Sequence, residues 1–256
     1  MSSQAIIEAV QLGDWDAISA VPPEPLRLAE DLEHVMTQLG DEGSQIAATL
    51  AGRYPGPQTA RFMLTMARST HQQAAATAAM SLSNLPQAPS AADIASTVTR
   101  AVDPMVRAHL YLALGRSRDA EALPALRQLL STETDATAAE KGAAAGARLG
   151  GAAERVALLA RVTGASVANA KDVYDDLLNV GDVRFAKGLL PWLDQQDPVT
   201  RIGGDEGGRS ARLCDLAVWT AMRLGVALPA SDTALANYDD ATLQATRAAL
   251  LRLPNP

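Results

Sequence analysis

The chain has 256 residues and a formal net charge of −7, and 48% of it is hydrophobic although aromatic residues make up only 4%. Its apolar side chains are mostly alanine and leucine, which favours closely packed helices and argues against a sheet, since sheets draw on β-branched and aromatic residues. No run of about 18 apolar residues occurs, so no membrane-spanning helix is expected, and a single cysteine, Cys214, excludes an internal disulfide.

The first segment, MSSQAIIEAVQLGDWD, carries Glu8, Asp14 and Asp16 and lacks the basic start of a secretory signal, so we expect none. Cys214 falls in an apolar helical run and is expected to be a buried thiol. Together these features favour a soluble protein in a reducing compartment, and we expect a cytoplasmic location.

Apolar residues recur at helical spacing along most of the chain. Leu28, Leu32, Val35 and Leu39 fall at steps of four, three and four residues, which predicts a helix with one apolar stripe. The same spacing predicts four later helices, and no segment alternates with the period of a strand. The later stripes are Leu123, Leu126, Leu129 and Leu130; Val173, Leu177 and Val180; Phe185, Leu189 and Trp192; and Leu213, Leu216, Thr220 and Leu224.

Proline marks three expected helix starts. Asp103-Pro104 and Asp197-Pro198 each predict a helix in which Asp is the N-cap and Pro is the first helical residue. Gly56-Pro57 predicts a third start by the same logic, with glycine as a weaker cap.

Glycines mark the expected helix ends, and their spacing indicates repeats. A glycine just past a helix can adopt the left-handed conformation that closes it. Four of the five candidates are separated by 35, 31 and 44 residues (150 − 115, 181 − 150 and 225 − 181), a range typical of stacked helix pairs. The longest interval contains the glycine-rich segment 203–208, GGDEGG, which we interpret as an insertion. The five glycines are Gly40, Gly115, Gly150, Gly181 and Gly225.

Two parts of the chain resemble a known repeat family. Residues 103–115, DPMVRAHLYLALG, resemble the first helix of a HEAT repeat of the phycobilin-lyase-like type, and residues 119–130, DAEALPALRQLL, resemble the second. A weaker copy runs through residues 185–201 and is interrupted by the glycine-rich segment, with its helix resuming near Arg209. The resemblance implies that Asp103 caps a helix and that Arg107 pairs with an acid of a neighbouring repeat.

The resemblance implies an all-α fold, namely an α-solenoid of stacked antiparallel helix pairs. Because each pair leaves an apolar face that the next pair covers, we predict a single domain over residues 1–256. Within it we expect atypical N-terminal helices over residues 1–70, HEAT-like repeats over residues 71–225 and a C-terminal capping helix over residues 226–256.

The sequence contains no recognisable catalytic or metal-binding motif. The three histidines, His34, His71 and His109, form no HExxH motif and no cluster with zinc spacing, and a lone histidine cannot build a metal site. The start of the glycine-rich segment is similar to the signature loop of diguanylate cyclases, but Gly207 replaces the aromatic residue there and the α/β context is missing. We therefore expect no catalytic residue, no metal and no cofactor.

Candidate partner-binding residues gather around the glycine-rich segment. Tyr174 lies beside acids in a chain poor in aromatic residues, where a tyrosine is either an interface anchor or core filler, whereas the stripe of Trp192 predicts a core position. Asp175 and Asp176 are adjacent and point about 100° apart on a helix, which argues against acid–base catalysis by the pair. The predicted partner-binding residues are Tyr174, Asp175, Asp176, Asp182, Asp194, Arg201, Asp205 and Glu206.

The charge is unevenly distributed along the chain. Residues 1–56 carry nine acidic and two basic side chains, residues 57–166 carry eight and eleven, and residues 167–256 carry twelve and nine. Binding to a phosphate backbone needs a concentrated basic face, so a nucleic acid partner is not expected. The acidic ends either serve solubility or form a docking surface for a basic partner.

Two classes of function stay open. The favoured one is a non-catalytic protein-binding module with a basic partner, for instance a bacterial inhibitor or immunity protein that neutralises a toxin by occluding its active site. The alternative is a HEAT-like enzyme, of the bilin lyase type or the DNA glycosylase type, or a scaffold subunit of a larger assembly. A glycosylase needs a basic groove with aromatic side chains, and the slight excess of bases in residues 57–166 does not supply one.

Overall fold

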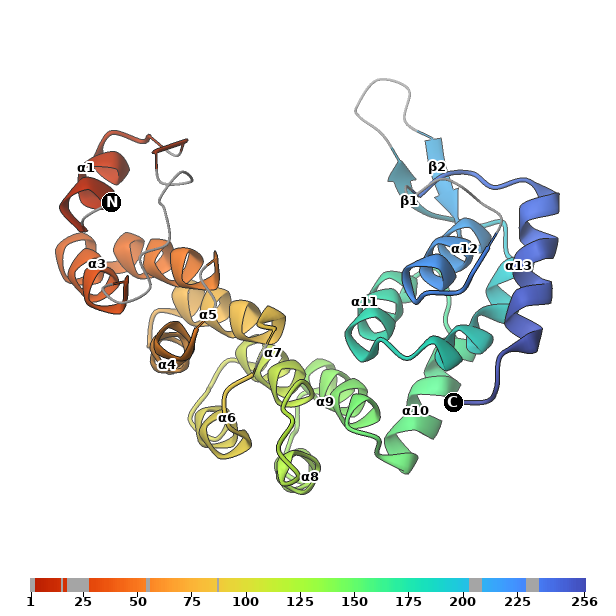
Figure 1. Cartoon of the computed structure of the whole chain (residues 1–256), viewed down its shortest axis with the longest axis horizontal. Coiled ribbons are helices and arrows are strands. Elements are labelled where there is room, and N and C mark those ends of the chain that lie inside the picture. Colours follow the sequence, from red (N-terminus) through yellow and green to blue (C-terminus); the bar gives the residue numbers. More distant parts are fainter. Residues whose placement is uncertain are drawn as a thin grey trace. The chain divides into compact units, whose positions relative to one another are not determined.

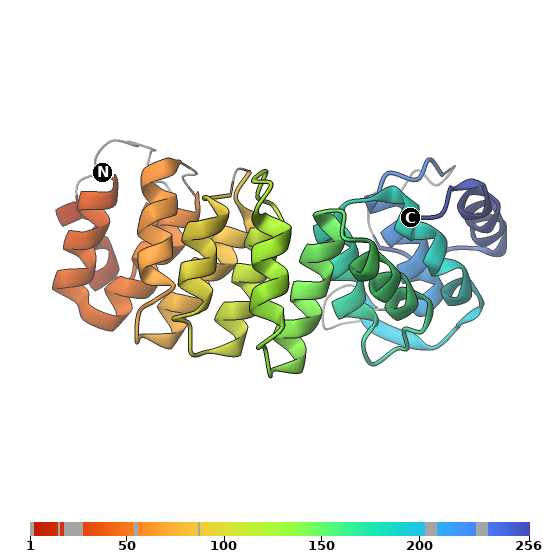
Figure 2. The same ribbon diagram turned by 90° about the horizontal axis from the view of Figure 1, so that it is seen from below.

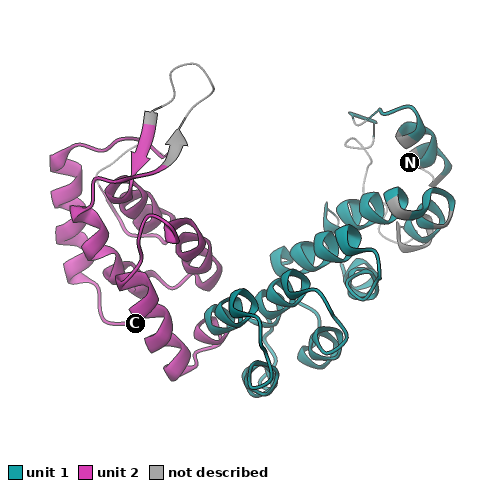
Figure 3. Cartoon of the chain, turned by 180° about the vertical axis from the view of Figure 1, so that it is seen from behind, with its two compact units in different colours: residues 1–145 teal, residues 146–256 magenta. Residues whose placement is uncertain are grey.

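The computed structural model describes residues 3–14, 16–17, 28–53, 56–86, 88–202, 209–228 and 235–256 (Figure 1). The chain divides into two compact units, residues 1–145 and residues 146–256 (Figure 3). Each unit has its own set of buried apolar side chains. The single continuous domain expected from the sequence stays a prediction.

The described part of unit 1, residues 1–145, is built of helices. α3 contains Gly40 with a φ of 57° and a ψ of −127°, so it consists of two helices that meet at a kink where a helix end was predicted. α4 begins at Pro57 with Gly56 as its N-cap, which confirms another prediction. The helices are α1 (Ser3–Gln11), α3 (Leu28–Arg53), α4 (Pro57–Met66), α5 (Gln72–Asn84), α6 (Ala91–Val98), α7 (Pro104–Leu114), α8 (Ala122–Leu130) and α9 (Ala136–Arg148), which runs across the boundary at residue 145.

Side-chain caps fix where α5, α7 and α9 begin. The ring Nδ1 of His71 accepts a 3.2 Å hydrogen bond from the Ala74 amide, and the Asp103 carboxylate accepts a 2.7 Å bond from the Met105 amide, as predicted for this cap. Asp135 accepts a 2.9 Å bond from an amide in the first turn of α9. Each cap follows the previous one by 32 residues (103 − 71 and 135 − 103), so the caps give the repeat period more regularly than the glycines do.

The helices of unit 1 form stacked pairs. α3, α5 and α7 pack against one another in turn, while α4 packs on α5 and α6 packs on α7. Figure 2 shows these helices standing nearly parallel in a row. Ala74, Ala78 and Ala79 of α5 are fully buried, and their small side chains let neighbouring helices approach closely.

Unit 2, residues 146–256, packs its helices around a 3-10 helix, η1, which contacts α10, α12 and α13. Phe185, Leu189 and Trp192 of η1 are fully buried, as their stripe predicted. The indole N–H of Trp192 donates a 2.8 Å hydrogen bond to the Val162 carbonyl of α10, so the side chain is both packed and satisfied. The elements are α10 (Ala152–Thr163), α11 (Ala170–Val180), η1 (Val183–Asp194), β1 (Pro198–Ile202), β2 (Arg209–Arg212), α12 (Leu213–Arg223) and α13 (Asp240–Arg252).

One predicted helix is wrong. Asp197-Pro198 precedes a strand rather than a helix, because β1 pairs antiparallel with β2, with Thr200 opposite Ala211. Three of the five residues in Pro198–Ile202 are β-branched, which suits an extended strand, and proline is tolerated as the first residue of a strand. The helix expected to resume near Arg209 begins instead after β2, at Leu213.

The glycines at helix ends act in two different ways. Gly181 has a φ of 67° and is the left-handed C-cap of α11, and three other predicted glycines also have positive φ. Gly115, at the end of α7, has a φ of −60°, so the left-handed conformation predicted there is wrong. A Cβ at Gly115 would lie 2.8 Å from the Ala145 Cα, so this glycine permits a close approach between the end of α7 and α9.

Candidate protein-binding face

α11 and α12 pack together in unit 2 and bring two aromatic side chains into contact (Figure 1). The rings of Tyr174 on α11 and Trp219 on α12 stack with their centroids 4.9 Å apart and their planes 15° from parallel. Both side chains are partly exposed. Such a stack contributes about 0.5–1.5 kcal/mol beyond its burial, so the two rings hold each other in place in the free protein.

Arg223 extends this aromatic pair along α12. It follows Trp219 by one helical turn, and its guanidinium carbon lies 5.9 Å from the centroid of the Trp219 ring, a cation–π contact. Burial raises the pKa of the Tyr174 hydroxyl, and the nearby Arg223 opposes part of that effect. The hydroxyl is therefore neutral at physiological pH and can donate a hydrogen bond. We call Tyr174, Trp219 and Arg223 the aromatic face.

Asp175 and Asp176 lie in different environments, in keeping with their predicted separation around the helix. Asp175 is exposed, and its carboxylate lies 3.4 Å from the Lys171 ammonium one turn earlier. The side chain of Asp176 is only 1% exposed and lies 2.6 Å from the Arg161 guanidinium of α10. Asp175 is thus accessible next to Tyr174, whereas the Asp176 carboxylate is part of an internal ion pair that joins α11 to α10.

Asp182 is held at the start of η1. It caps η1 by accepting a 3.1 Å hydrogen bond from the Arg184 amide, and its carboxylate lies 2.6 Å from the Arg184 guanidinium and 3.0 Å from that of Arg155. The side-chain hydrogen bond from Arg184 lowers the pKa of Asp182 to about 2. This carboxylate is therefore ionised and ties η1 to α10 at physiological pH.

The remaining predicted residues are spread over the other end of η1 and the hairpin. Asp194 is exposed and pairs with Arg247 of α13. Arg201 lies in β1, and Asp205 and Glu206 lie outside the described residues. The structure brings Tyr174 and Asp175 together on α11 and does not gather the other described acids with them.

Trp219 and Arg223 were not predicted from the sequence. A usable signal exists, because a tryptophan and an arginine four residues apart lie on one face of a predicted helix. Their contact with Tyr174 depends on how α11 and α12 pack, since Tyr174 and Trp219 are 45 positions apart in the chain (219 − 174).

The described residues offer no evidence for a metal site or for a reactive thiol. Among those residues, no three His, Cys, Asp or Glu side chains are grouped so that they could hold a metal ion. Cys214 is buried, as predicted, and burial raises the pKa of its thiol, which disfavours the reactive thiolate. The described helices include none with both the length and the apolar character needed to cross a membrane.

The helix pairs of unit 1 carry the evidence on family. The Arg107 guanidinium binds the Glu133 carboxylate through two hydrogen bonds of 2.8 Å, which joins α7 to the segment that follows α8. The resemblance implied that Arg107 pairs with an acid of a neighbouring repeat. The acid it binds, Glu133, lies instead at the end of the repeat that begins at Asp103, because the next cap is Asp135. Residues 59–147 match a family model described as HEAT repeats. These residues are HEAT repeats.

The HEAT repeats span α4 to α9 and supply the regular part of the chain. The phycobilin-lyase-like subtype stays a prediction. No curated protein and no solved structure gives a significant match to the chain. Stacked helical repeats of the HEAT kind present extended surfaces that bind other macromolecules, which supports a protein-interaction module.

Proposed function

We propose that the protein is a non-catalytic module that binds another protein through the aromatic face of α11 and α12. Trp, Tyr and Arg are the residue types that most often dominate the binding energy of protein interfaces. Here one residue of each type lies in a single cluster that is stacked before any partner binds. A pre-ordered cluster loses little side-chain entropy on binding. This stacked arrangement is the observation that carries the proposal.

The charges around the aromatic face are balanced, so the preference for a partner with a basic surface rests on the net charge of the chain. Asp172 and Asp175 are exposed on α11, while Lys171 and Arg223 supply charges of the opposite sign nearby. The net charge of −7 attracts a basic partner over a longer range, and the mixed charges at the face favour one orientation of that partner. Asp176 and Asp182 support this face indirectly, through the ion pairs that hold α11 and η1.

The finer proposal is an inhibitor or immunity protein that neutralises a bacterial toxin by covering its active site. A toxin that acts on nucleic acids or nucleotides has a basic active site, and an acidic protein can occlude such a site without any reaction chemistry of its own. The net charge and the aromatic face support this proposal. The rival enzyme would need reactive groups gathered at one site. Among the described residues, no group of three His, Cys, Asp or Glu side chains is placed to hold a metal ion.

Site-specific crosslinking identifies the partner. The full chain carries a photoreactive phenylalanine analogue at position 174, is irradiated in a lysate of the native host, and its crosslinked proteins are identified by mass spectrometry. The control carries the same analogue at Val156, which is 70% exposed on α10 of the same unit. We expect one protein to be captured from position 174 and not from position 156.

Variants then decide whether the aromatic face binds that purified protein. Trp219→Ala should weaken binding by roughly 30-fold, the effect of losing a hot-spot residue worth about 2 kcal/mol. Val156→Ala removes an exposed apolar side chain elsewhere in the unit and should leave the affinity unchanged. If Trp219→Ala and Tyr174→Ala both bind as tightly as the wild type, the aromatic face is not the site. A toxin whose activity persists with one equivalent of the full chain bound would contradict the inhibitor proposal alone.

A further inference from the structure

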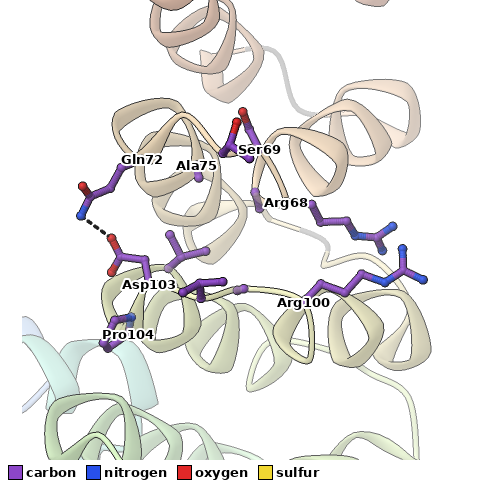
Figure 4. Close-up of a pocket in the computed structure, with 12 residues that line it drawn as sticks. Arg68, Ser69, Gln72, Ala75, Arg100, Asp103 and Pro104 are labelled. Carbon is purple, nitrogen blue, oxygen red and sulfur yellow. Dashed lines mark hydrogen bonds between the residues drawn. The ribbon is translucent and has the colours of Figure 1, made fainter.

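Unit 1 contains a pocket that is chemically different from the aromatic face. It has a volume of about 620 Å³ and lies between two successive helix pairs, where the turn from α4 to α5 faces the turn from α6 to α7 (Figure 4). Ala75, Ala101 and Val106 are among the residues that line it. A pocket of this size and lining falls in the range of roughly 300–1,000 Å³ that is typical of ligand sites.

Two arginines stand at the same end of this pocket (Figure 4). Arg68 and Arg100 are at equivalent positions, each two residues after the last residue of its helix, α4 or α6. Arg68 donates hydrogen bonds of 3.1 and 2.8 Å to the Thr97 hydroxyl, which fixes its side chain against α6. Arg100 is exposed, and its side chain makes no hydrogen bond or ion pair with any residue that the structure describes.

The acid in the pocket lining does not neutralise these arginines. The Asp103 carboxylate accepts a 2.6 Å hydrogen bond from the Gln72 amide group and a 2.7 Å bond from the Met105 backbone amide (Figure 4). Both of its oxygens therefore have partners at the other end of the pocket. A positive charge is left at the arginine end, and an anion placed there would be stabilised.

Two exposed apolar side chains lie close in sequence to Asp103, which lines the pocket. Val102 lines the pocket and is 91% exposed, and Met105 in the first turn of α7 is 51% exposed. A ligand that fills the pocket beside Val102 would remove this apolar surface from water, which favours binding. The Val102 carbonyl accepts a 2.7 Å hydrogen bond from Arg107, the residue that also binds Glu133, so the backbone that presents Val102 is held in place.

We propose that this pocket binds an acidic segment of a partner protein in which an apolar side chain is adjacent to a carboxylate. The apolar side chain fills the pocket beside Val102 and Val106. The carboxylate binds Arg100, whose planar guanidinium suits a bidentate contact, and Arg68 adds a second positive charge. A nucleic acid fits less well, because two arginines at a pocket lined by apolar side chains do not form the concentrated basic face that a phosphate backbone needs.

Selection of peptides from a random library displayed on phage, with the full chain as bait, tests the proposal. We expect the selected peptides to carry Asp or Glu next to a large apolar residue, and a labelled synthetic copy of one of them to bind in a fluorescence anisotropy titration. Arg100→Gln should weaken that binding by about tenfold, because it removes the charge-assisted contact. Val102→Ser, which alters an exposed residue and leaves the core intact, should weaken it as well.

The matched control is Arg118→Gln, which removes the same charge from another exposed arginine of unit 1 and should leave peptide affinity unchanged. The proposal is overturned if the selected peptides are not enriched in Asp or Glu. It is also overturned if Arg100→Gln and Arg118→Gln weaken peptide binding equally. So does a short single-stranded DNA that binds through Arg100 more tightly than the peptide. Trp219→Ala separates this site from the aromatic face, because the peptide should still bind this variant. If the peptide no longer binds it, the binding site is the aromatic face in unit 2.

Discussion

The guanidinium of Arg107 and the carboxylate of Glu133 meet through two hydrogen bonds of 2.8 Å, although the residues are 26 positions apart in the chain. The Tyr111 hydroxyl donates a further bond of 2.9 Å to Glu133. Because the Glu133 side chain is only 2% exposed, its charge is stabilised by these donors rather than by water. The contact therefore ties α7 to the end of the same HEAT repeat, just before the Asp135 cap of α9, and loss of either partner would leave a buried charge unpaired.

Glu133 should make the stability of the folded chain depend on pH in the acidic range. The hydrogen bond from Arg107 lowers the pKa of Glu133 from 4.5 to about 2. A carboxylate with a lower pKa in the folded than in the unfolded chain stabilises the fold above the unfolded value, and that contribution is lost as the pH falls to the folded value. We expect the free energy of unfolding to decrease between about pH 4.5 and pH 2.

Glu133→Gln tests this expectation by urea denaturation over a series of pH values. The variant should lose about 3–5 kcal/mol near neutral pH, since it leaves Arg107 without its buried partner, and should show a flatter profile in acid. Glu121→Gln, an exposed residue whose side chain makes no cap hydrogen bond, should keep the wild-type profile. An unchanged acid profile in Glu133→Gln would show that Glu133 does not have a lowered pKa.

Asp176→Asn and Asp175→Asn should behave differently although the residues are neighbours. The first change breaks the internal pair with Arg161 and should cost about 3 kcal/mol or more. The second removes an exposed carboxylate and should change stability by less than about 0.5 kcal/mol. It should also lower the affinity for the proposed partner. Thermal unfolding of the two variants measures the contrast, and equal melting temperatures would mean that the Arg161–Asp176 pair adds nothing to the fold.

Gly115→Ala should destabilise the HEAT repeats because the added methyl group would lie 2.8 Å from the Ala145 backbone. Separating α7 from α9 to relieve that contact should cost about 1–3 kcal/mol. Gly164→Ala is a suitable control, since this glycine also ends a helix without positive φ and the nearest atom to its Cβ is at 3.3 Å. Chemical denaturation should give Gly115→Ala a clearly lower free energy of unfolding than Gly164→Ala. A lower value for Gly164→Ala would contradict the packing described for α7.

Trp192→Phe should destabilise unit 2 more than Trp219→Phe does. The first change removes the hydrogen bond to the Val162 carbonyl inside the core, which should cost about 1–3 kcal/mol. The second keeps an aromatic ring against Tyr174 at a partly exposed position. Guanidinium denaturation followed by circular dichroism compares them, and similar midpoints would indicate that the Trp192 hydrogen bond contributes little.

Much of the fold could be predicted from the sequence because its determinants are local. Asp103-Pro104 is both a cap and a first turn, and the stripe of Phe185, Leu189 and Trp192 gives the buried face of η1 without knowledge of its neighbours. The resemblance to HEAT repeats implied that Arg107 pairs with an acid, although that acid lies in the same repeat and not in a neighbouring one. In each case the residues that decide the structure lie within one or two helices.

The predictions that were wrong or missing concern contacts between segments that are distant in the sequence. Asp197-Pro198 has the pattern of a helix start, but the segment after it pairs with β2, a partner beyond the glycine-rich segment. The aromatic face joins α11 to α12, and the sequence does not show which faces of two helices meet. For the same reason, Asp176 and Asp182 could not be recognised as members of internal ion pairs.

The hairpin of β1 and β2 has both of its ends tied together. The Leu213 amide donates a 3.0 Å hydrogen bond to the Asp197 carbonyl, and the Cys214 amide donates another of 3.0 Å to the Gln195 carbonyl. The chain thus leaves η1 and enters α12 at nearly the same point, and the residues in between do not set the distance that this connection must span. A change in chain length between the two strands should therefore leave η1 in place on α12, whereas Ala211, which is fully buried, and Arg212, which binds Asp215, constrain the sequence at the end of β2.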